Sequence, residues 1–319
     1  MIKKVVFMGT PDFAVGTLKA LIDSKYEVAA VFSQPDKPKG RGKALQMTPT
    51  KEVAVEAGIP VYQPAKIREA QWLSVLEELA PDVIVVVAFG QIIPESILKL
   101  PKYGCINVHA SLLPKYRGAA PIQWAVIDGE KESGVTTMQM DAGLDTGDML
   151  LKETVVLEEK ETGGSLFDKL SEVGAQLLIK TLEALENGTV AAQKQPAESP
   201  TPYAAMLTKK QGEIDWNQDA KKIECLIRGL NPWPSAYTHY RGKTLKIWDA
   251  QVEPEDSKEK AGFGTAVKVT KNDLVIQTAN GLLSLKEVQP EGKKRMGVDA
   301  FLRGYPVECG ECFGRGREE

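Results

Sequence analysis

In the first half of the chain, short apolar runs alternate with segments of helical periodicity. A run rich in strand-forming residues over 4–8 precedes an amphipathic segment over 13–24, and a second such run follows over 28–32. This order is typical of βαβ units, in which neighbouring strands are parallel. Residues 83–88 are apolar at every position, as expected for a central strand that is buried on both faces. The pattern predicts an α/β domain with a Rossmann-like parallel sheet.

The pattern changes after a long helix predicted over residues 164–186. Residues 187–202 contain one glycine and three prolines without sustained periodicity, which predicts an extended linker. After one more predicted helix, over 219–230, short alternating runs follow without helices between them, at 236–240, 245–249, 264–269, 274–278 and 282–286. Such runs are typical of a small antiparallel barrel, and we predict an OB-like β-barrel. The predicted domains are 1–188 and 208–319, joined by a linker over 189–207.

Composition is compatible with this two-domain organisation. The 319 residues are 43% hydrophobic and 26% charged, which is typical of globular proteins and enough for two cores. No apolar run approaches the roughly 18–20 residues of a membrane span, and the apolar start is too short for a signal peptide, so we expect a cytoplasmic protein. Cys309 and Cys312 have the spacing of half a metal site, but no second pair exists, so we expect no metal and assign these cysteines no role.

The net charge of −3 argues at first against a nucleic-acid partner. It averages two unlike parts, because residues 1–204 carry a net charge of −5 and residues 205–319 one of +2. A basic segment also stands out between positions 36 and 51, where a single acidic residue accompanies Lys37, Lys39, Arg41, Lys43 and Lys51. Its basic, Gly-rich and Pro-rich character suits an arm that orders on phosphate or RNA, and a solvated linker is the alternative.

Asn107 and His109 form the strongest candidate for chemistry. They lie two residues apart in a strand predicted over 105–109, so their side chains point to the same face. A Pro- and Gly-rich loop over 110–121 follows, at the strand end where open α/β sheets bind ligands. The chain has only two histidines, and we interpret the other, His239, as a half-exposed strand residue. The structural alternative for His109 is a ring that is satisfied by a backbone carbonyl near the strand end.

A loop over 140–148 contains three carboxylates between glycines, at Asp141, Asp145 and Asp148. The spacing does not match a calcium-binding loop. A solvated turn is one interpretation. The other is that one carboxylate reaches His109 and orients its imidazole, and the pattern does not indicate which of the three would do so.

These motifs closely resemble those of the methionyl-tRNA formyltransferases. The resemblance is carried by Asn107, His109, Asp145 and the Ser-Leu-Leu-Pro sequence at 111–114, and it extends over essentially the whole chain through segments at 9–13, 34–43 and 228–234. The Asn/His/Asp set and its loop are shared by the wider group of enzymes that take a formyl group from 10-formyltetrahydrofolate. The basic arm and the C-terminal barrel are the features that point to tRNA.

The resemblance implies transfer of the formyl group of 10-formyltetrahydrofolate, as donor substrate, to the amino group of methionine on initiator methionyl-tRNA. Asn107 would then donate to the developing oxyanion, an interaction worth about 3–4 kcal/mol in comparable sites. His109 would take the amine proton or donate to the oxyanion, and Asp145 would set its protonation. The residues implied in folate binding are Ser111, Leu112, Leu113 and Pro114. Those implied in tRNA binding are Lys37, Lys39, Arg41 and Lys43.

Two other functions are compatible with the same motifs. One is a different formyltransferase, or a hydrolase, that uses 10-formyltetrahydrofolate with a small acceptor or water. The other is a noncatalytic RNA-binding protein on a degenerate scaffold, for which replacing His109 would change no activity.

Overall fold

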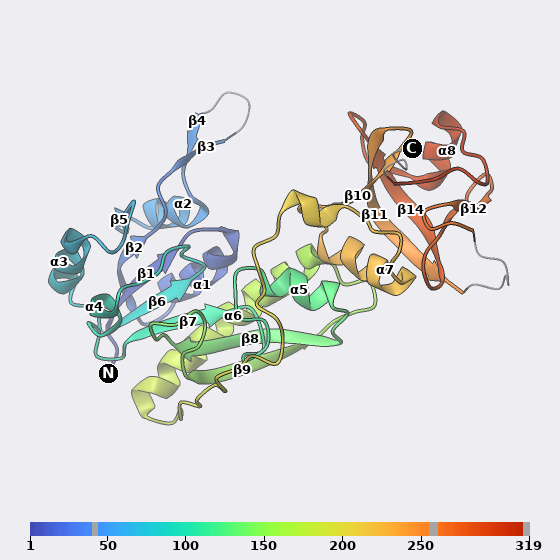
Figure 1. Cartoon of the computed structure of the whole chain (residues 1–319). Coiled ribbons are helices and arrows are strands. Elements are labelled where there is room, and N and C mark those ends of the chain that lie inside the picture. Colours follow the sequence, from blue (N-terminus) through green and yellow to red (C-terminus); the bar gives the residue numbers. More distant parts are fainter. Residues whose placement is uncertain (40–43, 255–260, 315–319) are drawn as a thin grey trace. The chain divides into compact units, whose positions relative to one another are not determined.

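The computed structural model describes residues 1–39, 44–254 and 261–314 (Figure 1). The chain forms two compact units, which are described separately. Unit 1 comprises Met1–Pro121, Glu132–Val156 and Phe167–Ala204, and unit 2 comprises Ile122–Lys131, Leu157–Leu166 and Ala205–Glu319. Two short segments from within the predicted first domain, 1–188, thus belong to unit 2. The domain bounds derived from the sequence stay a prediction.

Unit 1 is built on a seven-stranded sheet in the order β5-β2-β1-β6-β7-β8-β9. Its strands are β1 (Lys4–Gly9), β2 (Glu27–Phe32), β5 (Val61–Tyr62), β6 (Val83–Val87), β7 (Cys105–His109), β8 (Glu132–Gln139) and β9 (Met149–Val156). The first five pair with one another in parallel, and β8 and β9 extend the sheet from β7 with antiparallel pairs. The predicted Rossmann-like parallel sheet is confirmed, and the antiparallel extension is an addition that the apolar pattern did not predict.

Helices cover both faces of this sheet. The helices that lie wholly or mostly in unit 1 are α1 (Asp12–Ile22), α2 (Pro49–Glu56), α3 (Ala70–Leu79), α4 (Glu95–Leu98) and α6 (Gly163–Asn187). Leu76 of α3 and Ile97 of α4 share one core with Cys105 of β7. Gly174 of α6 lies against Val108. Because side chains alternate along a strand, Asn107 and His109 lie on the same face as Cys105, and Val108 lies on the α6 face.

The basic segment begins as a two-stranded ribbon (Figure 1). Strand β3 (Lys37–Lys39) pairs antiparallel with β4 (Ala44–Gln46), and Lys37 is exposed. Asp36 accepts hydrogen bonds from Lys51 and Gln63 at the base of the ribbon, and the bond from Lys51 holds the pKa of the Asp36 carboxyl below its usual value. Lys51 is therefore paired. The predicted tRNA-binding residues Arg41 and Lys43 lie outside the described residues.

Unit 2 contains an antiparallel sheet in the order β10-β11-β14-β13-β12, with β15 paired to β14. The strands are β10 (Ala236–Tyr240), β11 (Lys243–Glu253), β12 (Ala266–Val269), β13 (Leu274–Gln277), β14 (Leu282–Pro290) and β15 (Met296–Gly297). The short helices are α5 (Pro121–Ile127), η1 (Lys209–Gly212), α7 (Ala220–Gly229) and α8 (Val298–Gly304). Ile223 and Ile227 of α7 pack in one core with Ile247 and Leu285. The predicted succession of a parallel-sheet domain and a C-terminal domain of antiparallel strands is confirmed.

Three further observations concern the described parts of the chain. No helix there is long and apolar enough to cross a membrane. No group of three or more His, Cys, Asp or Glu side chains in those parts lies close enough together to hold a metal ion. Cys309 and Cys312 are exposed and free. His239 lies half-buried in β10, with its ring edge against Tyr237 at 5.8 Å between centroids.

Candidate active site

Asn107 lies near the carboxyl end of β7, between parallel β6 and antiparallel β8. Its Oδ1 atom is buried and has no hydrogen-bond partner among the described residues. Leaving such an acceptor unpaired costs roughly 1–3 kcal/mol, and nearly all buried polar groups in folded proteins avoid this cost. The fold thus holds a carboxamide there without using its oxygen, as expected of a group that is kept for a ligand.

His109 ends β7 with both ring nitrogens facing polar atoms of the protein. The ring is buried, with Nε2 3.0 Å from the carbonyl oxygen of Tyr116 and Nδ1 3.7 Å from Oδ2 of Asp145. A carbonyl oxygen only accepts, so Nε2 carries a hydrogen and donates it to Tyr116. Nδ1 is then the ring atom that takes up or releases a proton. A backbone carbonyl thus satisfies Nε2, as the structural interpretation of His109 predicted. Nδ1 is left available for chemistry.

Asp145 is the member of the acidic loop that lies beside His109. Its Oδ2 also accepts a hydrogen bond of 2.9 Å from the backbone N–H of Gly118, so the carboxylate lies between that amide and the imidazole. A positive charge on the ring would be stabilised by this carboxylate. Asp141 instead accepts from the Gly143 amide and the Thr146 hydroxyl, which is the local turn that the sequence allowed as an alternative.

The loop after β7 is fastened to the antiparallel strands that the sequence pattern did not predict. Thr136 of β8 donates through Oγ1 to the Ser111 carbonyl at 2.7 Å and accepts from the Leu113 amide at 3.1 Å. Lys152 of β9 donates to the Leu113 carbonyl, and burial lowers the pKa of this lysine. Thr136 and Lys152 therefore hold the main chain of the predicted folate-binding loop.

The four predicted folate-binding residues differ in exposure. The side chains of Ser111 and Leu113 are buried, and the Ser111 hydroxyl donates to the Lys115 carbonyl within the loop at 2.7 Å. Leu112 and Pro114 are only half-buried. The latter two are the members of the set that retain accessible surface for a ligand.

Part of the predicted linker runs along the same loop. Ser199 donates through Oγ to the Pro114 carbonyl at 2.8 Å, and Thr201 accepts through Oγ1 from the Tyr116 amide at 2.7 Å. Ala204 donates from its backbone to the Arg117 carbonyl at 2.8 Å. This stretch has no helix or named strand, as expected of an extended segment, but three of its residues bond the loop that follows β7.

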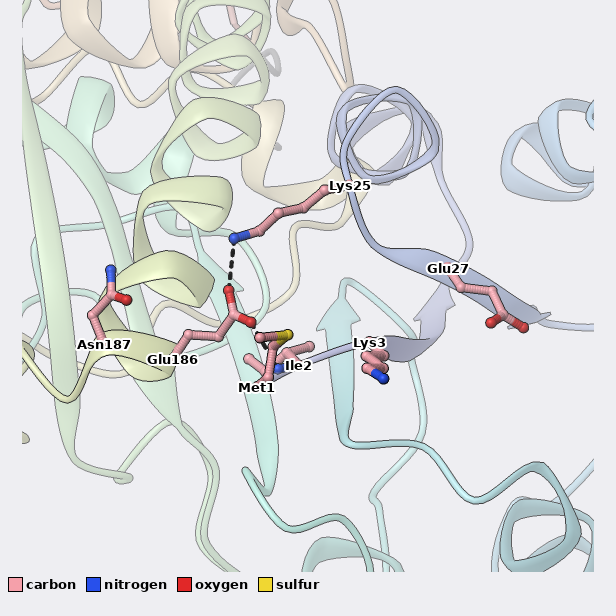
Figure 2. A pocket seen from close by; sticks show the side chains of 7 residues that line it. All are labelled: Met1, Ile2, Lys3, Lys25, Glu27, Glu186 and Asn187. Carbon is pink, nitrogen blue, oxygen red and sulfur yellow. Dashed lines mark hydrogen bonds and ion pairs between the residues drawn. The ribbon is translucent and has the colours of Figure 1, made fainter.

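A separate pocket of about 640 Å³ lies at the start of β1 and β2 (Figure 2). There Glu186 of α6 pairs with Lys25 at 2.7 Å and accepts from the Ile2 amide at 2.8 Å. Since β1, β6 and β7 are parallel and adjacent in the sheet, the beginning of β1 and the end of β7 lie at opposite ends of the strands. This pocket is therefore distinct from the site around His109.

Comparison with known proteins identifies the family. Residues 3–182 match the model of the family described as formyl transferase, and residues 206–306 match the formyl transferase C-terminal domain. The methionyl-tRNA formyltransferase of Agathobacter rectalis is 57% identical over 310 residues, which cover 97% of this chain and 99% of that relative. This chain belongs to the methionyl-tRNA formyltransferase family. The methionyl-tRNA formyltransferase of Lachnospira eligens is 58% identical over 98% of this chain and 99% of its own.

More distant structures share the fold of this methionyl-tRNA formyltransferase family member. An N-formyltransferase from Helicobacter canadensis, solved with folinic acid and dTDP-3-aminofucose, has a TM-score of 0.64 at 19% identity and covers 89% of this chain and 99% of its own. HypX from Aquifex aeolicus, solved with tetrahydrofolic acid, has a TM-score of 0.60 at 17% identity. The match covers 99% of this chain and 51% of HypX, so the chain spans about half the length of that protein. These structures confirm the predicted fold, and the sequence relatives confirm the predicted family.

Proposed function

We propose that this chain transfers the formyl group of 10-formyltetrahydrofolate to the amino group of methionine on initiator methionyl-tRNA. The observation that carries the proposal is the 57% identity, over nearly the full length of both chains, to a protein named methionyl-tRNA formyltransferase. No metal takes part in this proposal. The proposed compartment is the cytoplasm, where a bacterial initiator tRNA is used.

In the proposed reaction the amine attacks the formyl carbon, which forms the new C–N bond and leaves an oxyanion and an ammonium group. The Asn107 carboxamide donates to the oxyanion through Nδ2, while its buried Oδ1, which has no partner among the described residues, can accept a hydrogen bond from the substrate. His109 takes the ammonium proton at Nδ1, and Asp145 stabilises the resulting imidazolium. Collapse of the intermediate then breaks the bond to N10 of the folate, which receives the proton from the His109 imidazolium and leaves as tetrahydrofolate.

The donor is proposed to lie against the loop at 111–114, at the carboxyl end of β7. The half-buried side chains of Leu112 and Pro114 offer apolar surface for the pterin, while the main chain of the loop is fixed by Thr136 and Lys152. Ser111 and Leu113 are proposed to shape the pocket from behind, because both are buried.

The direct test supplies purified protein with 10-formyltetrahydrofolate and methionyl initiator tRNA. We expect formylmethionine to accumulate on the tRNA, with one tetrahydrofolate released per formyl group transferred. Methionyl elongator tRNA and uncharged initiator tRNA serve as controls. Donor consumption at an equal rate with and without charged initiator tRNA would instead favour a hydrolase or a small-molecule formyltransferase. Binding of tRNA with no donor consumption would favour a noncatalytic RNA-binding protein.

The tRNA is proposed to contact the basic segment through Lys37, Lys39, Arg41 and Lys43. Replacing Arg41 with alanine is expected to raise KM for tRNA about fivefold or more and to lower the salt dependence of tRNA binding by about one ion, as for a lost phosphate contact. KM for the folate donor should stay unchanged. Lys66→Ala, at an exposed position outside this segment, is the matched control. Equal losses for both substrates would overturn the assignment.

A further inference from the structure

A side chain from the predicted linker holds the main chain of the Asp145 loop. Gln195 donates through Nε2 to the carbonyl oxygens of Asp145, at 2.9 Å, and Gly147, at 2.8 Å. A carboxamide nitrogen has two hydrogens, so both are used on this one loop. Gln195 lies 50 residues beyond Asp145 in the sequence, which makes the contact purely tertiary.

The local hydrogen bonds of the loop that Gln195 holds are those of Asp141 with the Gly143 amide and the Thr146 hydroxyl, which do not involve Asp145. Asp145 adopts a φ of +55°, a conformation that non-glycine residues seldom take without support. Gly147 admits no side chain, because a Cβ atom there would lie 1.8 Å from the Gln139 carbonyl oxygen. The segment thus depends on outside contacts to present the Asp145 carboxylate to His109.

Arg117 fixes Gln195 in turn. Its Nε atom donates to Oε1 of Gln195 at 2.9 Å, while Nη2 and Nη1 donate to the carbonyl oxygens of Pro196, at 2.7 Å, and Ala197, at 3.2 Å. The residue is only 7% exposed, and these three acceptors are uncharged. By occupying Oε1, the guanidinium orients the carboxamide so that its nitrogen faces the Asp145 loop.

We propose that Arg117 and Gln195 are positioning residues that hold Asp145 against His109. Asp145 is held by two hydrogen bonds. The amide of Gly118, next to Arg117 in the chain, donates to the Asp145 carboxylate at 2.9 Å, and Gln195 holds the Asp145 main chain. Arg117 is linked to both contacts: Gly118 is its neighbour in the chain, and Gln195 is its hydrogen-bond partner. The inference rests on the proposed function, in which Asp145 acts on His109.

Replacing Arg117 or Gln195 should affect the chemical step and not substrate binding, because neither residue is proposed to touch a substrate. Oδ2 of Asp145 lies 3.7 Å from Nδ1 of His109, so a small displacement of the loop changes that pairing strongly. A misplacement of about 1 Å typically costs on the order of 100-fold in rate. We therefore expect loss of kcat with KM for both substrates retained.

The test replaces Gln195 with glutamate, which keeps the size and an acceptor for Arg117 but removes both donated hydrogen bonds. We expect kcat to fall about 10–100-fold, with both KM values within about twofold of the parent protein. Gln195→Met, of similar size and uncharged, should give the same result and guards against a charge effect or misfolding of the glutamate variant. Gln193→Ala is the matched control, since Gln193 is exposed and bonds through its backbone.

A double-mutant cycle with Asp145→Asn separates positioning from a general structural role. If Gln195 acts through the carboxylate, Gln195→Glu should change kcat less than threefold in the Asp145→Asn background. A loss of the same size in both backgrounds would overturn the inference, as would kcat values for both Gln195 variants that equal that of Gln193→Ala. Donor consumption with whichever acceptor the parent protein uses is the readout, so failure of the tRNA assignment gives a different result from failure of this inference.

Discussion

The His109→Ala variant is expected to lose formyl transfer while it still binds both substrates. General acid–base catalysis by a positioned side chain typically contributes about 100- to 10,000-fold, and we expect a loss of kcat in that range. The reason is that Nε2 is already bonded to the Tyr116 carbonyl, so Nδ1 is the one ring atom left to accept the amine proton. Single-turnover formylation at saturating substrate measures the loss, and equilibrium binding of donor and tRNA checks that both still bind.

His239→Ala is the matched control for this experiment. It removes the second histidine of the chain, which lies on β10 in unit 2 and was predicted to be scaffold. We expect kcat within about twofold of the parent protein, because no proposed step uses this residue. A His109→Ala variant with kcat near that of the control would contradict the proposed base and favour the noncatalytic alternative.

Replacing Asn107 is expected to lower activity without lowering stability. Loss of one oxyanion donor typically costs about 100- to 1,000-fold in kcat, and we expect Asn107→Leu to fall in this range with little change in KM. The free energy of unfolding should be unchanged or higher, since leucine has the same branched shape and removes the unpaired buried oxygen. Steady-state kinetics and urea denaturation of the same preparation provide both readouts.

Asn107→Asp distinguishes an oxyanion donor from a residue that only fills space. A carboxylate near the developing oxyanion repels it, so this variant should be at least as inactive as Asn107→Leu despite its closer shape. Substantial activity in the aspartate variant, or a clear fall in the unfolding free energy of Asn107→Leu, would show that Asn107 serves the fold.

The strands with a clear apolar pattern were predictable from the sequence, and the strand over 105–109 has the predicted bounds. The antiparallel strands β8 and β9 were not, because polar residues occupy buried positions in β8. Thr137 is fully buried and bonds Thr181 at 2.8 Å, and Thr136 is fully buried against the loop at 111–113. In the sequence, a threonine whose hydroxyl bonds a distant partner cannot be distinguished from a surface threonine. The apolar pattern of a buried strand is therefore missing from β8.

The residues of the candidate site were likewise predictable only in part. Strand alternation brought Asn107 and His109 together, whereas Asp145 could be selected from three carboxylates only through the family resemblance. Arg117 and Gln195 were not predicted at all. They lie 78 residues apart, and the short polar stretch around Gln195 has the composition of a spacer. Long-range contacts of this kind leave no periodic signal.

Three acceptors in the network proposed to hold His109 and Asp145 are main-chain oxygens. Tyr116, Pro196 and Ala197 each contribute a carbonyl, which any amino acid supplies. The hydrogen bonds to these carbonyls therefore do not depend on which side chains the three residues carry. Gly118 is the exception, since a Cβ atom there would lie 2.6 Å from the Ala204 carbonyl oxygen. A comparison of side chains alone would therefore miss part of this network.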